Sequence, residues 1–299
     1  MLRRFRLEEP ESVQEASELL ARYGESSVVY AGGTELLLAM KESLVRSDRL
    51  INIKKIPDLN QVKLDDGLLR IGALTTHRSL EESTTLQKHF PAFVELERNV
   101  ANERVREVGT LGGNLCFAEP HSDPGALLLV SGAMFVAEKG STKREIPIEK
   151  FFVDAYENCL EQDEILTEIR MPQPSANSAF RYLKFGYLER PSVGVALFLR
   201  SANQGKAIAE AKIAVGSAGP LPKRIEEAED LLKDKSLDDV SHLIGQAGQV
   251  AAQASDVMSD IHGSSDYKEH LIQVLLKRAF QSVSEQWASG IRGEEEAHV

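Results

Sequence analysis

The chain has 299 residues, of which 42% are hydrophobic and 27% charged, a composition that is typical of a globular protein and excludes a disordered one. Lys and Arg number 35 against 46 Asp and Glu, so the formal net charge is −11. The basic residues are scattered among acidic ones, which excludes the basic stripe that nucleic-acid-binding proteins direct at phosphates. The length predicts two domains.

Membrane-spanning, secreted and metal-binding proteins are not expected either. The longest apolar run, residues 125–137, is shorter than the roughly 20 residues that span a bilayer, and Ser131 and Gly132 interrupt it. Acidic residues follow the basic N-terminus where a signal peptide would be apolar, so we expect a cytoplasmic protein. The two cysteines, Cys116 and Cys159, are too few for the four thiolates that most iron–sulfur clusters need. The seven histidines form no HxxxH or HExxH pair, so no metal site is predicted.

The first half of the chain reads as helices and strands in alternation. Apolar residues at helical spacing predict a helix over 11–22. A short apolar run predicts a strand over 27–31, which ends in a glycine pair before helical composition resumes over 35–40. Further strands are predicted over 50–53, 68–73, 134–137, 145–148 and 165–171, and further helices over 86–105 and 123–129.

A segment rich in Pro, Ser and Asn, residues 172–178, is the best candidate for a linker between domains. Strands followed by helices are predicted beyond it, and this order indicates an α+β domain with helices on one face of an antiparallel sheet. The last residues, 288–299, lack an apolar period and are expected to be frayed. The predicted strands cover 180–187, 193–200 and 212–215, and the predicted helices cover 225–232, 236–254 and 266–287.

Two glycine-rich turns are the main candidates for a binding site. We call residues 31–35 (Ala-Gly-Gly-Thr-Glu) the first glycine loop and residues 109–114 (Gly-Thr-Leu-Gly-Gly-Asn) the second glycine loop. Adjacent glycines let the backbone approach a ligand closely and turn several N–H groups toward one anion, so two such loops could hold a pyrophosphate. Neither loop has the spacing of a Walker A or Rossmann turn. A single glycine pair could simply end a strand, but two favour a ligand site.

The motifs around these loops resemble a known family. Residues 30–37 (YAGGTELL), 108–115 (VGTLGGNL) and 119–124 (EPHSDP) resemble the FAD-binding medium subunit of molybdenum hydroxylases, of the carbon monoxide dehydrogenase and xanthine dehydrogenase type. The resemblance continues through residues 164–166, Lys184 and the run 190–194, and so covers nearly the whole chain.

The resemblance implies a fold, a domain division and a set of FAD contacts. The fold would be α+β, with a two-part FAD-binding domain of the vanillyl-alcohol oxidase (PCMH) type over 1–175, split near residue 57, and a carbon monoxide dehydrogenase flavoprotein C-terminal domain over 176–287. The first pyrophosphate loop would comprise Ala31, Gly32, Gly33, Thr34 and Glu35. The second would comprise Thr110, Gly112, Gly113 and Asn114. Asp123 would contact the adenosine ribose, and Leu166 and Lys184 would lie along the isoalloxazine. Tyr187, as an aromatic residue, is a further candidate that could stack on this ring.

Each of the isolated candidates also has a purely structural interpretation. Asp123 precedes a proline and would serve as a helix N-cap, which is compatible with ribose contact. Lys184 could be a solvated residue of an edge strand, and Tyr187 could belong to the core. His77 and His121 flank the loops and are interpreted as ordinary surface histidines rather than phosphate contacts.

The function implied by the resemblance is electron transfer within an oxidoreductase, with no catalytic residue on this chain. FAD here would receive electrons from [2Fe–2S] clusters of a small subunit, after hydroxylation at a molybdopterin cofactor on a large subunit, and pass them to an external acceptor. The expected assembly is a dimer of heterotrimers. The alternatives are a free-standing flavin oxidoreductase of the same fold and a scaffold without flavin. The substrate stays open among carbon monoxide, purines, N-heterocycles and aldehydes, and the acceptor among NAD, quinone and oxygen.

Overall fold

The computed structural model describes residues 2–186, 190–202 and 207–296. The chain forms two compact units, of which unit 1 comprises residues 1–119 and 132–173, and unit 2 comprises residues 120–131 and 174–299. The short segment 120–131 thus packs with the second unit although it interrupts the first in sequence. A single boundary at residue 175 does not describe this crossing, and the predicted domain limits and the split near residue 57 stay predictions.

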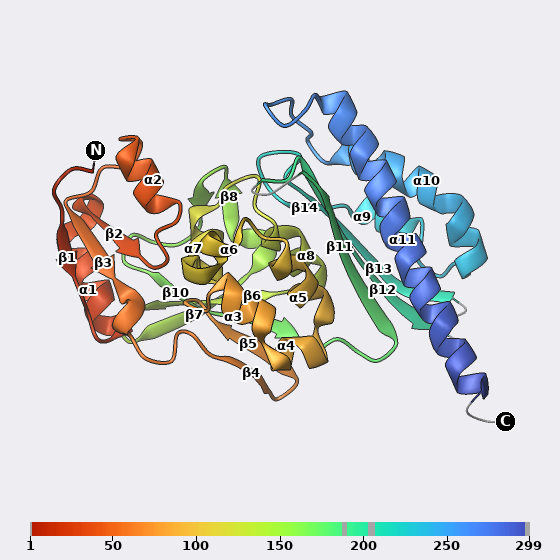
Figure 1. Ribbon diagram of the computed structural model, residues 1–299, viewed down its shortest axis with the longest axis horizontal. Coiled ribbons are helices and arrows are strands. Elements are labelled where there is room, and N and C mark those ends of the chain that lie inside the picture. Colours follow the sequence, from red (N-terminus) through yellow and green to blue (C-terminus); the bar gives the residue numbers. More distant parts are fainter. Residues whose placement is uncertain (1, 187–189, 203–206, 297–299) are drawn as a thin grey trace. The chain divides into compact units, whose positions relative to one another are not determined.

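Unit 1 begins with a small parallel sheet in the strand order β1–β3–β2 (Figure 1). Helix α1 starts where the Ser12 hydroxyl accepts a hydrogen bond from the Glu15 amide at 3.1 Å. It buries Ala16 and Leu20 in one cluster with Ile51 of the sheet, as its apolar spacing predicts. The elements are β1 (Arg6–Glu8), α1 (Val13–Tyr23), η1 (Gly24–Ser26), β2 (Ser27–Tyr30), α2 (Leu36–Lys41), β3 (Arg49–Asn52) and η2 (Ile53–Lys55).

The larger part of unit 1 is an antiparallel sheet in the order β4–β5–β10–β6–β7, together with five short helices (Figure 1). The sequence predicts β5, β6 and β10 in place, predicts β7 a few residues too late, and misses the edge strand β4. The elements are β4 (Val62–Asp65), β5 (Leu68–Gly72), α3 (His77–Glu82), α4 (Thr84–His89), α5 (Pro91–Arg98), α6 (Glu103–Val108), α7 (Leu111–Phe117), β6 (Met134–Lys139), β7 (Thr142–Pro147), η3 (Ile148–Lys150), β8 (Phe152–Asp154), β9 (Glu157–Asn158) and β10 (Ile165–Pro172).

Two expectations for unit 1 differ from the structure. The single helix predicted over 86–105 is three helices, because Pro91 starts α5 and because Ala101 adopts a left-handed φ of 44° before Asn102 caps α6. The second glycine loop is not a turn throughout. Thr110 is the N-cap of α7, its hydroxyl accepts from the Gly113 amide at 3.1 Å, and residues 111–114 are helical.

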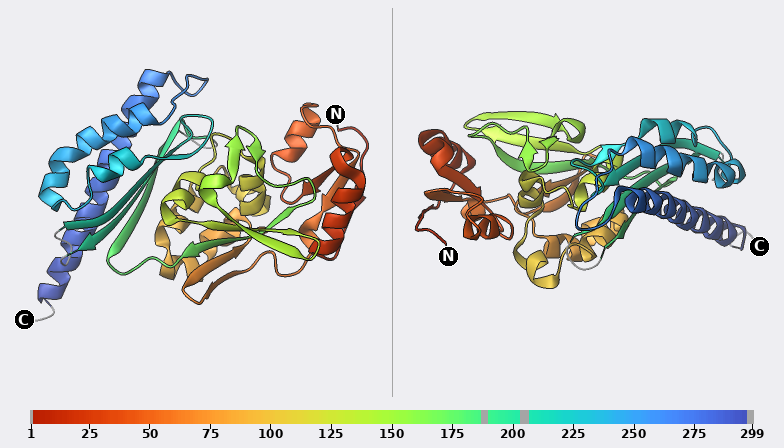
Figure 2. Two further views of the ribbon diagram at one scale, coloured as in Figure 1. Left: turned by 180° about the vertical axis from the view of Figure 1, so that it is seen from behind. Right: turned by 90° about the horizontal axis from the view of Figure 1, so that it is seen from above.

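Unit 2 is an antiparallel sheet in the order β11–β12–β13–β14 with α10 and α11 on one face (Figures 1 and 2). Strand β12 alternates, so that Val195 and Leu197 enter the core cluster while Gly194 and Ala196 point to the opposite face. The elements are α8 (Pro124–Ser131), β11 (Ser178–Phe185), β12 (Val193–Ala202), β13 (Ala207–Gly216), β14 (Lys223–Arg224), α9 (Glu226–Asp230), α10 (Leu237–Ala254) and α11 (Ser265–Glu296).

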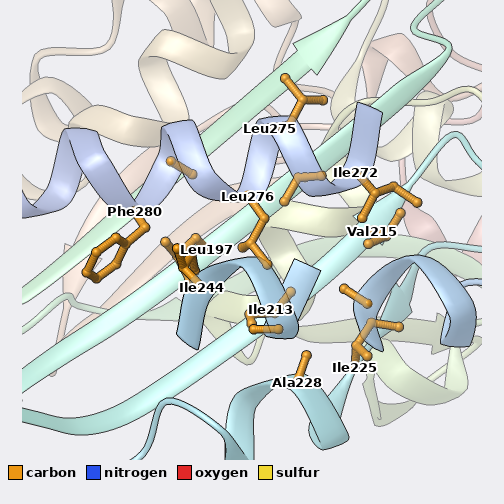
Figure 3. Close-up of a cluster of buried hydrophobic side chains, with 14 of the residues drawn as sticks. Leu197, Ile213, Val215, Ile225, Ala228, Ile244, Ile272, Leu275, Leu276 and Phe280 are labelled. Atoms are coloured by element: carbon orange, nitrogen blue, oxygen red, sulfur yellow. The ribbon is translucent and has the colours of Figure 1, made fainter. Parts of the chain in front are cut away.

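The core of unit 2 lies between this sheet and its helices. Leu197 and Ile213 of the sheet meet Ile244 of α10 and Ile272 and Leu276 of α11 (Figure 3). Each of these five side chains is at most 2% exposed. Helix α11 continues to Glu296, so residues 288–296 of the expected tail belong to a helix, whose extension costs little and is favoured by glutamate. Fraying of this tail stays a prediction. Residues 297–299 lie outside the described part.

Candidate functional site

The first glycine loop joins strand β2 to helix α2 and offers unpaired backbone donors. Gly33 has a φ of 77°, a left-handed conformation that turns the chain sharply after the strand. Within the described residues, the amide N–H groups of Gly32, Gly33 and Thr34 have no hydrogen-bond partner. Three consecutive free N–H groups around a left-handed residue are the arrangement that binds phosphate oxygens in backbone nests. The loop therefore has the chemistry of an anion site.

Residues 111–114 of the second glycine loop do not offer such donors, contrary to the expectation from its glycines. The amide of Leu111 donates to the Thr75 carbonyl at 3.0 Å and that of Gly112 to the Ala73 carbonyl at 2.9 Å. The Gly113 amide is bound by the Thr110 hydroxyl, and the Asn114 amide donates to the Thr110 carbonyl at 2.9 Å. All four N–H groups are thus used to start α7 and attach it to its neighbours. A ligand contact of residues 111–114 would therefore have to come from side chains.

The structure brings the two glycine loops side by side. A Cβ atom added to Gly32 would lie 2.3 Å from the Val108 carbonyl oxygen and 2.8 Å from the Gly109 Cα atom. A Cβ atom added to Gly113 would lie 3.9 Å from the Ala31 Cβ atom. The loops are 74 or more residues apart in sequence, so this proximity is a tertiary feature that the sequence pattern alone did not show. The absence of a side chain at Gly32 allows its backbone to contact the backbone of Val108 and Gly109.

A buried histidine, His77, forms a backbone hydrogen bond with the second glycine loop. The His77 amide donates to the Gly109 carbonyl at 3.0 Å, and the His77 Nδ1 atom lies 2.7 Å from the Glu97 Oε2 atom. His77 is 2% exposed and Glu97 is fully buried, so the interpretation of His77 as a surface residue is wrong. The reason is a partner 20 residues away in α5 that the local sequence does not reveal. His77 therefore has a structural role next to the candidate site.

Asp123, in unit 2, binds two side chains of strand β11. The Lys184 ammonium donates to Asp123 Oδ2 at 2.9 Å, and the Tyr182 hydroxyl donates to Asp123 Oδ1 at 2.7 Å. Asp123 is only 3% exposed. Burial first, and then the negative charge of Asp123, raise the pKa of Tyr182 well above its usual value of 10. Tyr182 was missed from sequence, although its spacing of two from Lys184 places both side chains on one face of a strand.

Asp123 and Lys184 were expected to contact different parts of FAD, and the structure places the two side chains in contact with each other. Their contacts with FAD stay predictions. The carboxylate of Asp123 compensates the positive charge of Lys184. Lys184 does lie on an edge strand, β11, but its side chain is only 14% exposed and is therefore not fully solvated.

The remaining candidates are placed as follows. Leu166 is buried at the start of β10, next to a register shift between Leu166 and Glu168. The neighbouring Thr167 carbonyl accepts from the Ala73 amide at 2.9 Å, and the Ala73 carbonyl accepts from the second glycine loop, so Leu166 lies near that loop. Tyr187 lies outside the described residues. His121 is partly exposed, and its Nε2 atom lies 2.8 Å from Asp260 Oδ2.

Comparison with known proteins places the chain. Residues 3–174 match the FAD binding domain in molybdopterin dehydrogenase, and residues 178–283 match the carbon monoxide dehydrogenase flavoprotein C-terminal domain. The chain belongs to this flavoprotein family. The expected family and the α+β fold class, with an FAD-binding domain and a C-terminal domain, are therefore confirmed, and FAD is the cofactor of the domain that the chain carries.

Individual relatives match over nearly their full length. The carbon monoxide dehydrogenase medium chain of Hydrogenophaga pseudoflava is 30% identical over 95% of this chain and 98% of its own. The xanthine dehydrogenase FAD-binding subunit of Escherichia coli O157:H7 is 28% identical over 89% and 91%. The solved structure of quinoline 2-oxidoreductase from Pseudomonas putida 86 superposes with a TM-score of 0.88 at 26% identity, over 96% of this chain and 99% of that one. These relatives are components of oxidoreductases.

Neither a membrane-spanning helix nor a metal-binding cluster is found among the described residues. No helix there combines the length and the apolar character needed to cross a bilayer. No group of three or more His, Cys, Asp and Glu side chains in the same residues is arranged to hold a metal ion.

Proposed function

We propose that this chain is the FAD-binding electron-transfer subunit of a molybdenum hydroxylase. The proposal is supported by the family match and by one observation above all, the three unpaired amide N–H groups of Gly32, Gly33 and Thr34. These donors would hold the pyrophosphate of FAD, with Ala31 and Glu35 as the ends of the loop. The second glycine loop would contribute through Thr110 and Asn114 side chains and through the packing that its glycines allow.

FAD, when bound, supplies the redox chemistry that converts single-electron transfer from iron–sulfur clusters into two-electron delivery to an acceptor. The side chains of this chain bind and orient the cofactor. We assign the Asp123–Lys184 pair to the adenosine ribose, because a carboxylate accepts hydrogen bonds from ribose hydroxyls, whereas the charge of Lys184 is already compensated by Asp123. Leu166 and Tyr187 remain candidates for the isoalloxazine.

The partners in this proposal are a large chain with the molybdopterin cofactor and a small chain with [2Fe–2S] clusters, assembled as a dimer of heterotrimers. The relatives carry names that refer to carbon monoxide, xanthine and quinoline, so members of one family serve different substrates. Selection of the substrate thus belongs to the large chain.

Affinity purification of the tagged chain from its native source tests the proposal. We expect stoichiometric FAD on this chain and co-purification of two further chains that carry molybdenum and iron, measured by mass spectrometry of the metals. A chain that purifies alone and turns over a substrate with its own FAD would instead be a free-standing oxidoreductase. A chain that takes up no FAD would be a scaffold.

A further inference from the structure

The hydroxyl of Tyr182 is a buried donor to Asp123. Tyr182 belongs to β11 and is 9% exposed, and its hydroxyl donates to Asp123 Oδ1 at 2.7 Å. Lys184 binds the other oxygen of the same carboxylate at 2.9 Å. Both carboxylate oxygens of Asp123 thus accept hydrogen bonds from side chains of one strand, β11.

The sheet is built to make room for this hydroxyl. Along β11, Leu183 packs against the core cluster, so Tyr182 and Lys184 point to the opposite face, where Asp123 lies. On the neighbouring strand β12, Gly194 stands opposite Lys184. A Cβ atom on Gly194 would lie 2.3 Å from the Tyr182 hydroxyl oxygen. Any larger residue at position 194 would displace this hydroxyl.

The charge state of Tyr182 suits a donor to a carboxylate. Burial and the nearby Asp123 charge both disfavour the phenolate, so the hydroxyl keeps its proton at neutral pH and donates it in the hydrogen bond. Hydrogen bonds to ionised acceptors are about twice as strong as neutral ones. The Tyr182 hydroxyl thus fixes the orientation of an anionic side chain, a task that the ring alone cannot perform.

We propose that Tyr182 is a positioning residue of the cofactor site, which acts through Asp123 and for which Gly194 provides the space. This inference rests on the proposed function, in which Asp123 contacts FAD. Tyr182→Phe keeps the ring and removes only the hydroxyl. We expect it to raise the Kd for FAD about tenfold, as the loss of one hydrogen bond to a charged group implies. Gly194→Ala, which displaces the same hydroxyl, is expected to raise the Kd as well.

A double-mutant cycle on the full chain separates positioning from simple packing. FAD affinity is measured by fluorescence titration for Tyr182→Phe in the wild-type and in the Asp123→Ala background. If Tyr182 acts through Asp123, its substitution changes the Kd less than about twofold when Asp123 is absent. Asp123→Asn is a second background that keeps a neutral acceptor, and there the effect is expected to fall to about threefold.

Tyr267→Phe is the matched control, since this exposed tyrosine of unit 2 has no hydrogen-bond partner for its hydroxyl among the described residues. It should leave the Kd unchanged. An equal effect of Tyr182→Phe in every background, or no effect in the wild type, would overturn the inference. A chain that binds no FAD refutes the proposed function itself, whereas a chain that binds FAD equally well with Asp123→Ala refutes only the role of Tyr182 through Asp123.

Discussion

Gly32 and Val108 meet backbone to backbone, because a Cβ atom on Gly32 would lie 2.3 Å from the Val108 carbonyl oxygen. This contact joins the first glycine loop to the residue that precedes the second. A carbonyl cannot give way as the end of a flexible side chain can, so any side chain at position 32 would push the loops apart. The two loops can therefore lie this close together only because residue 32 has no Cβ atom.

Gly32→Ala is therefore expected to lower both the thermal stability of the chain and its affinity for FAD. Gly245→Ala is the matched control, since a Cβ atom there meets nothing within 4 Å in an exposed turn of α10. That control should keep FAD affinity and raise stability by up to about 1 kcal/mol, as alanine is the better helix former. Differential scanning calorimetry and FAD titration check both variants. Wild-type behaviour of Gly32→Ala would show that the contact has no importance.

The buried pair of His77 and Glu97 provides a second prediction. Glu97→Gln keeps the shape of the side chain and weakens the contact with His77 Nδ1, so the free energy of unfolding should fall by about 1–3 kcal/mol. Glu95→Gln, on the exposed side of the same helix, should change it by less than about 0.5 kcal/mol. Urea denaturation measures both. Equal stability of the two variants would rule out a structural role for the pair.

Asp260 predicts a specific acid sensitivity. Partial burial opposes its ionisation, but hydrogen bonds from Lys268, the His262 amide and His121 outweigh burial and lower its pKa from 3.8 to about 2. A lowered carboxyl pKa stabilises the folded state above the unfolded value, and this contribution is lost as the pH falls from about 4 toward 2. The stability difference between wild type and Asp260→Asn should thus shrink over that range. Urea titrations at several pH values test this, and a constant difference would contradict the assignment.

The metal content of the isolated chain is a fourth prediction. With Cys116 and Cys159 as its two thiols, the chain should contain neither iron nor acid-labile sulfide after purification without partners. Elemental analysis by plasma mass spectrometry provides the measurement. Stoichiometric iron in such a sample would refute the division of cofactors among three subunits.

Local patterns in the sequence were sufficient for the elements that flank the site. The apolar spacing of α1 and the run before Gly32 predict the helix and the strand that the structure contains. The glycines at 112 and 113 led to the prediction of a turn, because glycine has a low helix propensity. The structure has a helix there, since the Thr110 cap and the packing of Gly112 on Ala73 outweigh that low propensity.

Contacts between distant residues could not be read from a single sequence. The Asp123–Lys184 pair spans 61 residues and depends on segment 120–131 packing with unit 2. The interpretation of Asp123 and Lys184 as separate contacts followed from the resemblance, which assigns positions one at a time. Strand alternation would have revealed Tyr182 as a neighbour of Lys184, but its bond to Asp123 needed the fold.

The affinity of the full chain for FAD, compared with that of Gly33→Ala, tests the central claim most directly. Gly33 has a φ of 77° and its Cβ atom would lie 2.4 Å from the Tyr30 ring, so the substitution disturbs the three free N–H groups. Gly67→Ala is the control, with a similar φ of 73° and open space around it. We predict stoichiometric FAD on the wild type and on Gly67→Ala, and a Kd about tenfold higher or more for Gly33→Ala. A wild-type chain that binds no FAD, or an unchanged Kd for Gly33→Ala, would contradict the account.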